Sequence, residues 1–227
     1  MNKPVLKVDW ATYEAAKYAC ENWHYSKCVP KFKQNWIGVW ENSKFIGVIS
    51  FGRSSTPYLG TAYGLDTTEC VELTRIALTK HLTPVSRIMS LAFKFIKRRS
   101  PGIRLFVTLA DPLQNHYGGV YQATNWIYVG LSSANTQYFY GGKWRNDSSL
   151  MRMFQTNKAL KASLQKRNIS GKFKYLMPLD DEMRKRIAPL AQPYPKRVKK
   201  QDSERPSELG GAVPTDTLQN AAVNTEE

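Results

Sequence analysis

Four side chains able to do acid–base or ligand chemistry crowd one short stretch of the chain: Asp111, Gln114, His116 and Tyr121. They follow an apolar run at residues 105–109, which predicts a buried strand. The Asp-Pro pair after this run indicates a turn that begins a helix. Because ligands in open α/β sheets bind beyond the carboxyl ends of strands, we expect a site at this junction.

Each of these side chains also has a purely structural interpretation. Asp111 could simply cap the helix that follows it, and Tyr121 could simply pack its ring against a sheet. A second polar pair, His24 and Tyr25, lies far away in sequence on an expected loop. His24 could equally serve as a helix C-terminal cap. If His24 points away from the site, we expect His116 to take the role of the base.

The charge of the chain points to a polyanionic partner. The 227 residues carry a net charge of +15, from 33 Lys and Arg against 18 Asp and Glu. Residues 201–227 hold six acidic residues and one Arg, so the first 200 residues carry +20 and the tail −5. Nucleic acid is the expected partner of such a surface, and a merely basic soluble protein is the alternative.

The apolar pattern predicts one α/β domain. We expect helices at 10–23 and 85–99, a hairpin of strands at 36–40 and 45–51, and further strands at 70–78, 105–109, 126–129, 137–140 and 149–154, with a helix between 109 and 126. Residues 52–68 read as a long loop. The expected divisions are a catalytic domain over 1–180, a basic extension over 181–200 and a disordered acidic tail over 201–227.

The cysteines and the hydropathy favour a reduced, cytoplasmic protein. Cys20, Cys28 and Cys70 are too few for a disulfide framework, and no CxxC pair indicates a structural zinc site. No apolar run approaches the roughly 20 residues that span a bilayer, so we expect no membrane partner.

The order of these elements resembles the layout of the Gcn5-related N-acyltransferase fold. That resemblance implies an α/β (α+β) fold with a mixed central sheet flanked by helices, and acetyl-CoA or another acyl donor as cofactor. The fold usually carries a glycine-rich turn whose amides cradle pyrophosphate, but residues 78–90 contain no glycine. The groups then expected to hold the donor are Arg75, Ser86, Arg87 and Ser90, with Lys80 nearby.

Three longer motifs, at residues 22–30, 72–78 and 110–130, resemble the Mom family of phage DNA-modification proteins. This resemblance implies an enzyme that converts adenine in double-stranded DNA to N6-carbamoylmethyladenine, the acetamido form, which protects phage DNA from host restriction. By the same resemblance Arg75 is a functional position on the central strand. The resemblance also implies a catalytic set that could bind an iron ion: His24, Tyr25, Asp111 and Tyr121.

Chemistry at adenine N6 makes further demands on the chain. The N6 lone pair is delocalised into the ring, so the enzyme must polarise the amine, exclude water and align a two-carbon donor. The amine lies inside the duplex, so we expect the base to flip into a pocket. Aromatic residues for stacking are Trp36, Trp126, Tyr138, Tyr140 and Trp144, and basic residues for phosphate are Lys31, Lys33, Lys143 and Arg145.

Two other functions remain open from the residues alone. One is an acetyl-CoA-dependent N-acetyltransferase of a small-molecule or protein amine, and the other is a non-catalytic DNA-binding protein. The His, Asp and Tyr set could likewise work as a metal-free acid–base relay instead of an iron site.

Overall fold

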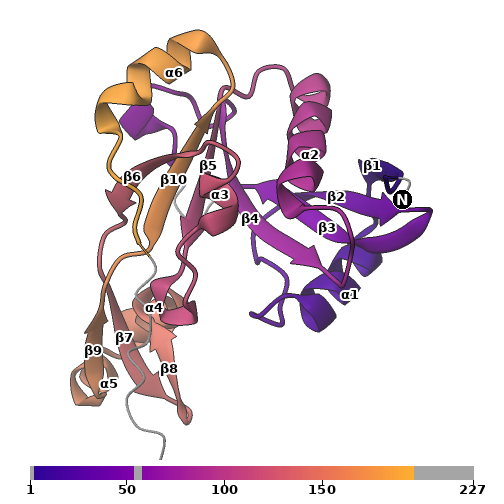
Figure 1. The fold of residues 1–227 in the computed structure, drawn as a ribbon. Coiled ribbons are helices and arrows are strands. Elements are labelled where there is room, and N and C mark those ends of the chain that lie inside the picture. The colour runs from indigo at the N-terminus through magenta and orange to yellow at the C-terminus, as the bar shows by residue number, and fades with distance from the viewer. Residues whose placement is uncertain (1–2, 54–57, 197–227) are drawn as a thin grey trace, which may run out of the picture. The chain divides into compact units, whose positions relative to one another are not determined.

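The computed structural model describes residues 3–53 and 58–196 (Figure 1). The strands in these ranges are β1 (Leu6–Trp10), β2 (Gln34–Glu41), β3 (Lys44–Gly52), β4 (Cys70–Leu78), β5 (Leu105–Ala110), β6 (Ile127–Leu131), β7 (Asn135–Tyr140), β8 (Lys143–Asn146), β9 (Lys166–Ile169) and β10 (Phe173–Pro178). The α-helices are α1 (Tyr13–Trp23), α2 (Val85–Arg99), α3 (Gly119–Gln122), α4 (Asp147–Thr156), α5 (Lys158–Ser163) and α6 (Asp181–Ile187). Three 3-10 turns are η1 (Thr61–Tyr63), η2 (Pro112–Gln114) and η3 (Ala188–Leu190).

Seven strands form a central sheet in the order β1-β2-β3-β4-β5-β10-β6. All neighbours in this sheet run antiparallel except β4 and β5, which run parallel. A parallel pair needs a crossover connection, and α2 supplies it between β4 and β5. The mixed central sheet that the sequence predicts is therefore confirmed.

Helices cover both faces of this sheet. Neighbouring residues on β3 point to opposite sides, with Val48 packed against α1 and Ile49 in the cluster that includes α2. Neighbouring residues on β5 also point to opposite faces of the sheet. Phe106 lies in the cluster that includes α2, whereas Val107 packs with Met183 of α6. The result is a three-layer arrangement with α1 and α6 on one face and α2 on the other.

The two parallel strands part soon after they meet. Only three residue pairs join β4 to β5, from Cys70↔Leu105 to Glu72↔Val107. One more link follows, in which the Thr108 hydroxyl donates to the Leu73 carbonyl at 3.0 Å. Beyond it the strands diverge, so the middle of the sheet opens.

A β-bulge on β4 sits at this opening. The β3–β4 register shifts between Ser50↔Arg75 and Phe51↔Leu73, which leaves Thr74 as the extra residue. The Thr74 hydroxyl contacts the Ser50 hydroxyl and donates to Gln34 Oε1 at 2.6 Å. Because a bulge re-aims the side chains beside it, the bulge determines the direction in which Arg75 points.

Residues 132–172 form an inserted element between β6 and β10, with its own three-stranded sheet in the order β8-β7-β9. The strand predicted at 149–154 is wrong, because these residues belong to helix α4. Leu150 and Phe154 are spaced four residues apart, which is a helical period, and both pack on Tyr138. The strand predicted at 137–140 lies within β7.

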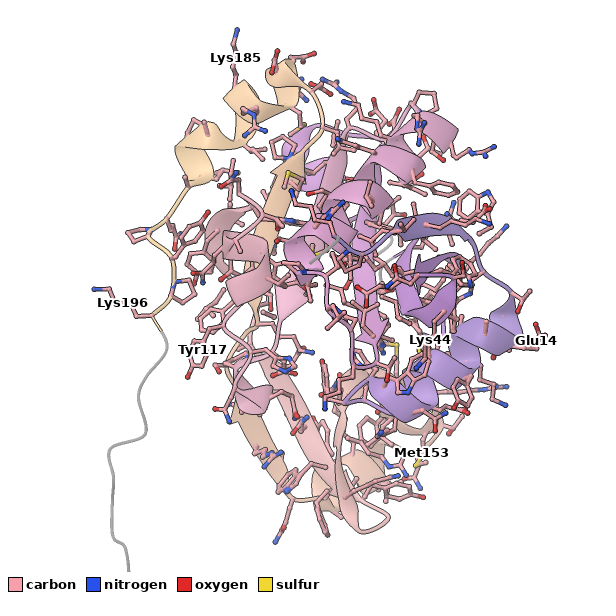
Figure 2. All side chains as sticks on the ribbon, turned by 45° about the vertical axis from the view of Figure 1, so that its right-hand side comes forward. Glu14, Lys44, Tyr117, Met153, Lys185 and Lys196 are labelled. Carbon is pink, nitrogen blue, oxygen red and sulfur yellow. The ribbon has the colours of Figure 1, made fainter. Side chains whose placement is uncertain are left out.

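The compact unit extends to Lys196, beyond the expected boundary at residue 180. Helix α6 begins at an Asp180 cap and buries Met183 and Ile187. Arg104, at the start of β5, binds both Asp180 carboxylate oxygens at 2.8 and 3.0 Å. Lys185 of α6 points outward in Figure 2, whereas Arg186 donates to the Tyr63 and Gly64 carbonyls at 3.1 and 3.2 Å. The expected acidic tail at 201–227 lies outside the described residues, as does part of the expected loop at 52–68.

Glycine allows the chain to turn tightly before α3. Gly118 has φ +74°, and a Cβ there would lie 2.4 Å from the Tyr175 ring. The Tyr175 hydroxyl in turn donates to the Tyr117 carbonyl at 2.6 Å, which fixes the turn. At Gly119, the next residue, an added Cβ would have no atom within 4 Å.

This pair of glycines gives a matched test of the fold. Gly118→Ala should lower the free energy of unfolding by about 2–4 kcal/mol. The alanine would have to adopt a left-handed backbone conformation, and its Cβ would clash with the Tyr175 ring. Gly119→Ala should leave it unchanged or raise it slightly, because alanine favours the helix. Denaturant unfolding measures both, and equal stabilities of the two variants would contradict the tight turn.

Candidate active site

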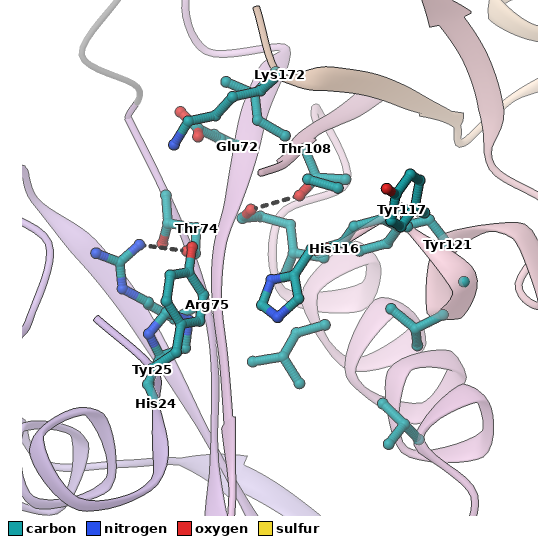
Figure 3. A pocket seen from close by; sticks show the side chains of 18 of the residues that line it. His24, Tyr25, Glu72, Thr74, Arg75, Thr108, His116, Tyr117, Tyr121 and Lys172 are labelled. Carbon is teal, nitrogen blue, oxygen red and sulfur yellow. Dashed lines mark hydrogen bonds between the residues drawn. The ribbon is translucent and has the colours of Figure 1, made fainter. Parts of the chain in front are cut away.

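A pocket of about 600 Å³ occupies the opening between β4 and β5. One wall comes from β4 and from the loop that follows α1, and the other comes from the end of β5 and residues 115–121. Figure 3 shows His24, Tyr25 and Arg75 on the first side and His116, Tyr117 and Tyr121 on the second. The structure thus brings together two segments that are more than 80 residues apart in sequence, at the carboxyl end of a parallel strand.

His24 is buried, with 8% of its surface exposed. Its Nδ1 accepts a hydrogen bond from the Ser26 backbone N–H at 3.1 Å, and the Ser26 hydroxyl lies 2.8 Å away. Burial first, and then the positive charge of Arg75, lower the pKa of His24 to about 4. His24 is therefore neutral near pH 7, and because Nδ1 accepts, its proton resides on Nε2. This histidine is a hydrogen-bond donor rather than a ready base.

Tyr25 joins the two walls through ring contacts. Its ring centroid lies 4.3 Å from that of His24 and 4.8 Å from that of His116, the latter edge-on. His116 is exposed at the pocket mouth. His24 lines the pocket rather than pointing away from it, so the condition under which His116 was expected to be the base is not met, and the role of His116 stays a prediction.

Arg75 brings a positive charge into the pocket. Its Nη1 donates to the Thr74 carbonyl at 2.7 Å, and its Nε is buried with no hydrogen-bond partner among the described residues. An unpaired buried donor is costly unless a ligand satisfies it. Arg75 is therefore ready to bind a group that carries negative charge or a lone pair.

Tyr121 reaches the pocket from α3. Its ring packs against Trp126 and Tyr175, at centroid distances of 5.3 and 5.4 Å. Burial raises the pKa of Tyr121 to about 12, although the nearby Thr108 hydroxyl acts in the opposite direction. The phenol therefore stays protonated at neutral pH and can donate a hydrogen bond. The packing interpretation of the ring is therefore confirmed, the hydroxyl is hydrogen-bonded with Thr108 beside the pocket, and a catalytic role of Tyr121 stays a prediction.

Asp111 lies at the edge of the site rather than within it. One carboxylate oxygen accepts from the Leu113 N–H at 3.0 Å, which caps η2, and the other pairs with Lys172 at 3.0 Å. The capping role considered from the sequence is therefore present. Lys172, Glu72 and Thr108 line the pocket, and the sequence reasoning missed all three. Thr108 and Glu72 lie on strands that were predicted, but nothing in their spacing marks them.

Comparison with known proteins decides the family. The model of the Mom protein family matches residues 5–196. The chain belongs to the Mom protein family. It is also 27% identical over 203 residues to the methylcarbamoylase Mom of Escherichia phage Mu, a match that covers 84% of each chain. The family predicted from three sequence motifs is thus confirmed.

Solved structures similar to this Mom-family chain include two acetyltransferases. A putative acetyltransferase from Acinetobacter baylyi ADP1 has a TM-score of 0.44 at 12% identity and covers 79% of this chain and 95% of its own. An IAA acetyltransferase from Bacillus cereus ATCC 14579 has a TM-score of 0.39 at 10% identity, with coverage of 77% and 100%. The strand order and directions described above confirm the predicted acyltransferase-like sheet. Among the described residues, no helix is both long and apolar enough to span a membrane.

The loop before α2 does not fit the pyrophosphate of coenzyme A. Its Leu82 and Thr83 N–H groups already donate to the Glu41 carboxylate at 2.9 and 2.8 Å. Contact with the Thr83 hydroxyl and these N–H bonds lower the pKa of Glu41, so a negative charge stands where a phosphate would bind. The Ser90 hydroxyl donates to the Ser86 carbonyl in its own helix. Ser86, Arg87 and Ser90 stay predictions as donor-binding residues, whereas Arg75 lines the pocket.

The donors expected for iron do not fit a metal ion as they are arranged. In the described part of the chain, no three His, Cys, Asp or Glu residues gather into a metal-binding group. His24 carries its proton on Nε2, Tyr121 keeps its phenol proton, and Asp111 is engaged by Lys172. Three free cysteines, of which Cys20 and Cys70 are buried, lie outside the pocket. The iron site stays a prediction from the resemblance.

The aromatic residues expected for stacking divide into two groups. Trp126 is fully buried in the main core and Tyr138 is buried in the inserted element, so both are structural. Trp36 is half-buried beside α1, while Tyr140 and Trp144 are half-buried in the small sheet. Lys31, Lys33 and Lys143 are exposed, as expected for phosphate contacts, and Arg145 is half-buried.

The lowered pKa of His24 gives a pH-dependent stability. Between about pH 6.5 and pH 4, His24 is protonated in the unfolded chain but neutral in the folded chain. The free energy of unfolding therefore falls as the pH falls through this window. The expected loss is about 2–3 kcal/mol. His24→Gln removes this titration, so its unfolding free energy should fall less over the same window. Parallel pH profiles of the two proteins in urea unfolding would show that His24 is not held neutral.

Proposed function

We propose that this chain is a transferase that modifies adenine N6 in double-stranded DNA to give N6-carbamoylmethyladenine, and so shields phage DNA from host restriction. The observation that carries the proposal is the pocket between β4 and β5, which Arg75 and Tyr121 line from opposite walls in a chain of the Mom family. The name of the phage Mu relative, a methylcarbamoylase, supports the same class of reaction.

The size and shape of the pocket suit a flipped base. Its volume of about 600 Å³ lies within the range of small-ligand sites. Tyr25 and Tyr117 offer aromatic faces at the wall, on which an extruded adenine can stack. A base held there leaves the duplex outside, where the +20 charge of the first 200 residues attracts phosphate.

The residues of the pocket can divide the chemistry among them. Attack by N6 on the methylene carbon of an activated carbamoylmethyl donor, which already carries the amide nitrogen, forms one N–C bond, releases the leaving group from that carbon and frees one N6 proton. His116 at the mouth is placed to accept that proton. The Tyr121 phenol and the His24 Nε2–H remain donors, and Arg75 supplies fixed positive charge. Together they stabilise negative charge that develops on the donor.

The donor itself must bind without the usual pyrophosphate cradle. The Glu41 carboxylate already accepts hydrogen bonds from the N–H groups before α2. The two-carbon donor therefore binds at Arg75 rather than at the start of α2. Acetyl-CoA alone would transfer an acetyl group and give N6-acetyladenine, so an acyl-CoA donor needs a separate source of the amide nitrogen, and its phosphates must bind elsewhere. Lys172, half exposed at the rim and paired with Asp111, is a cation within the same pocket.

Mass spectrometry of digested plasmid DNA tests this function. Plasmid from bacteria that express the protein should yield adenosine heavier by the acetamido group. Tyr121→Phe should lower the yield by about 100-fold or more, because it removes a donor hydroxyl but keeps the packed ring. Tyr13→Phe, at an exposed position on α1, is the matched control and should modify DNA normally.

Two outcomes of this experiment would count against the proposal. Unmodified adenosine from cells that contain folded wild-type protein would overturn it. Transfer to small amines or proteins with DNA left untouched would instead favour an ordinary N-acetyltransferase. Full activity of Tyr121→Phe would leave the reaction standing but remove Tyr121 from it.

A further inference from the structure

One face of the small sheet in the inserted element is open. Residues paired across strands point to the same side, so Gln137, Phe139, Trp144 and Arg167 share one face. Helix α4 covers the opposite face, where Phe154 packs on Tyr138. Phe139 on the open face is 40% exposed, although an aromatic ring would ordinarily be covered.

Arg167 is held in a fixed orientation on this open face. Its Nε and Nη2 donate to Gln137 Oε1 at 2.9 and 2.7 Å, and its guanidinium stacks 4.4 Å from the Trp144 ring centroid. Gln137 is itself held, because its amide nitrogen donates to Asn146 Oδ1 at 3.0 Å. A guanidinium fixed in this way has lost its conformational freedom before any ligand arrives, which favours binding.

Charge and position both connect the inserted element with DNA. Residues 132–172 contain eight Lys and Arg against one acidic residue, Asp147. The element joins the domain through a narrow neck, in which Ser132 and Lys172 exchange two hydrogen bonds of 2.8 and 2.9 Å. Gly171 is needed there, since a Cβ would lie 1.7 Å from the Ser132 carbonyl oxygen. Lys172 lines the pocket, so the element is rooted at the pocket rim.

We infer that the open face of the small sheet binds duplex DNA beside the flipped base. Arg167 contacts a backbone phosphate through the guanidinium edge that Gln137 leaves free, and Phe139 packs against a base exposed by the opened stack. Aromatic rings stack on any base, and an oriented guanidinium matches phosphate oxygens. The inference rests on the proposed function for its DNA partner, but it concerns binding rather than chemistry.

Fluorescence anisotropy with a labelled duplex that carries one mismatched adenine tests the inference. Phe139→Ala and Arg167→Gln should each weaken binding about tenfold. Arg167→Gln should also reduce the slope of log affinity against log salt by about one, whereas Phe139→Ala should leave the slope unchanged. Arg98→Gln on α2, away from the small sheet in Figure 1, and Leu82→Ala at an exposed apolar position are the controls and should bind within about twofold of wild type.

Folding of the variants is checked by circular dichroism and thermal melting. If Arg167→Gln is unfolded, Arg167→Lys is used in its place. Lysine keeps the positive charge but cannot make the paired hydrogen bonds to Gln137 or stack flat on Trp144, so we expect binding between that of wild type and that of a neutral variant. Wild-type affinity for Phe139→Ala and Arg167→Gln, or equal losses in the controls, would overturn the inference. The inference would also be overturned if Phe139→Ala and Arg167→Gln weakened binding of single-stranded DNA or RNA but not binding of the duplex.

The two proposals can fail separately. Duplex binding that depends on Phe139 and Arg167, in a protein that leaves adenine unmodified, would refute the proposed function and keep this interaction surface. Modified adenine together with unchanged binding by both variants would keep the function and reject the surface.

Discussion

The site depends on the parting of β4 and β5. Two parallel strands that pair at only three positions leave a gap in the middle of a sheet, and the chain lines that gap with polar groups beside apolar side chains of the core. The bulge at Thr74 directs Arg75 into the opening, and the Gly118 turn brings Tyr121 to it from the other side. Without the divergence, both side chains would meet a closed sheet. Fold and site are therefore set by the same backbone feature.

Burial then determines the protonation states within that gap. The same desolvation lowers the pKa of His24 and raises the pKa of Tyr121, so each group is held in its neutral form. Arg75 reinforces the effect on His24 by repelling a second positive charge. The pocket thus combines these neutral hydrogen-bond donors with the cation of Arg75 and, at the rim, that of Lys172. Such a set suits a substrate that develops negative charge, and it leaves proton acceptance to groups at the mouth.

Sequence patterns predict the parts of this protein whose signal is local. The hairpin of β2 and β3 and helix α2 follow from alternation and helical period. The grouping of His24 and Tyr25 with Tyr121 came only from the resemblance to the Mom family, because no local pattern links segments so far apart in sequence. Strands β1, β8, β9 and β10 were not predicted, although β1 alternates apolar and charged residues as a strand does. β10 lies between two strands that precede it in the chain, so its place depends on distant partners. The bulge at Thr74 and the approach of Lys172 depend on register between strands, which no single segment encodes. Asp111 shows the same limit, since its cap is local but its partner Lys172 is 61 residues away.

The proposed reaction requires an adenine to enter the gap between β4 and β5. A crystal structure of the protein bound to duplex DNA would test this claim most directly. We expect one adenine outside the helical stack, with its ring beside Tyr25 and N6 between Arg75 and Tyr121. A complex in which every base stays stacked, with the DNA bound away from this pocket, would contradict it.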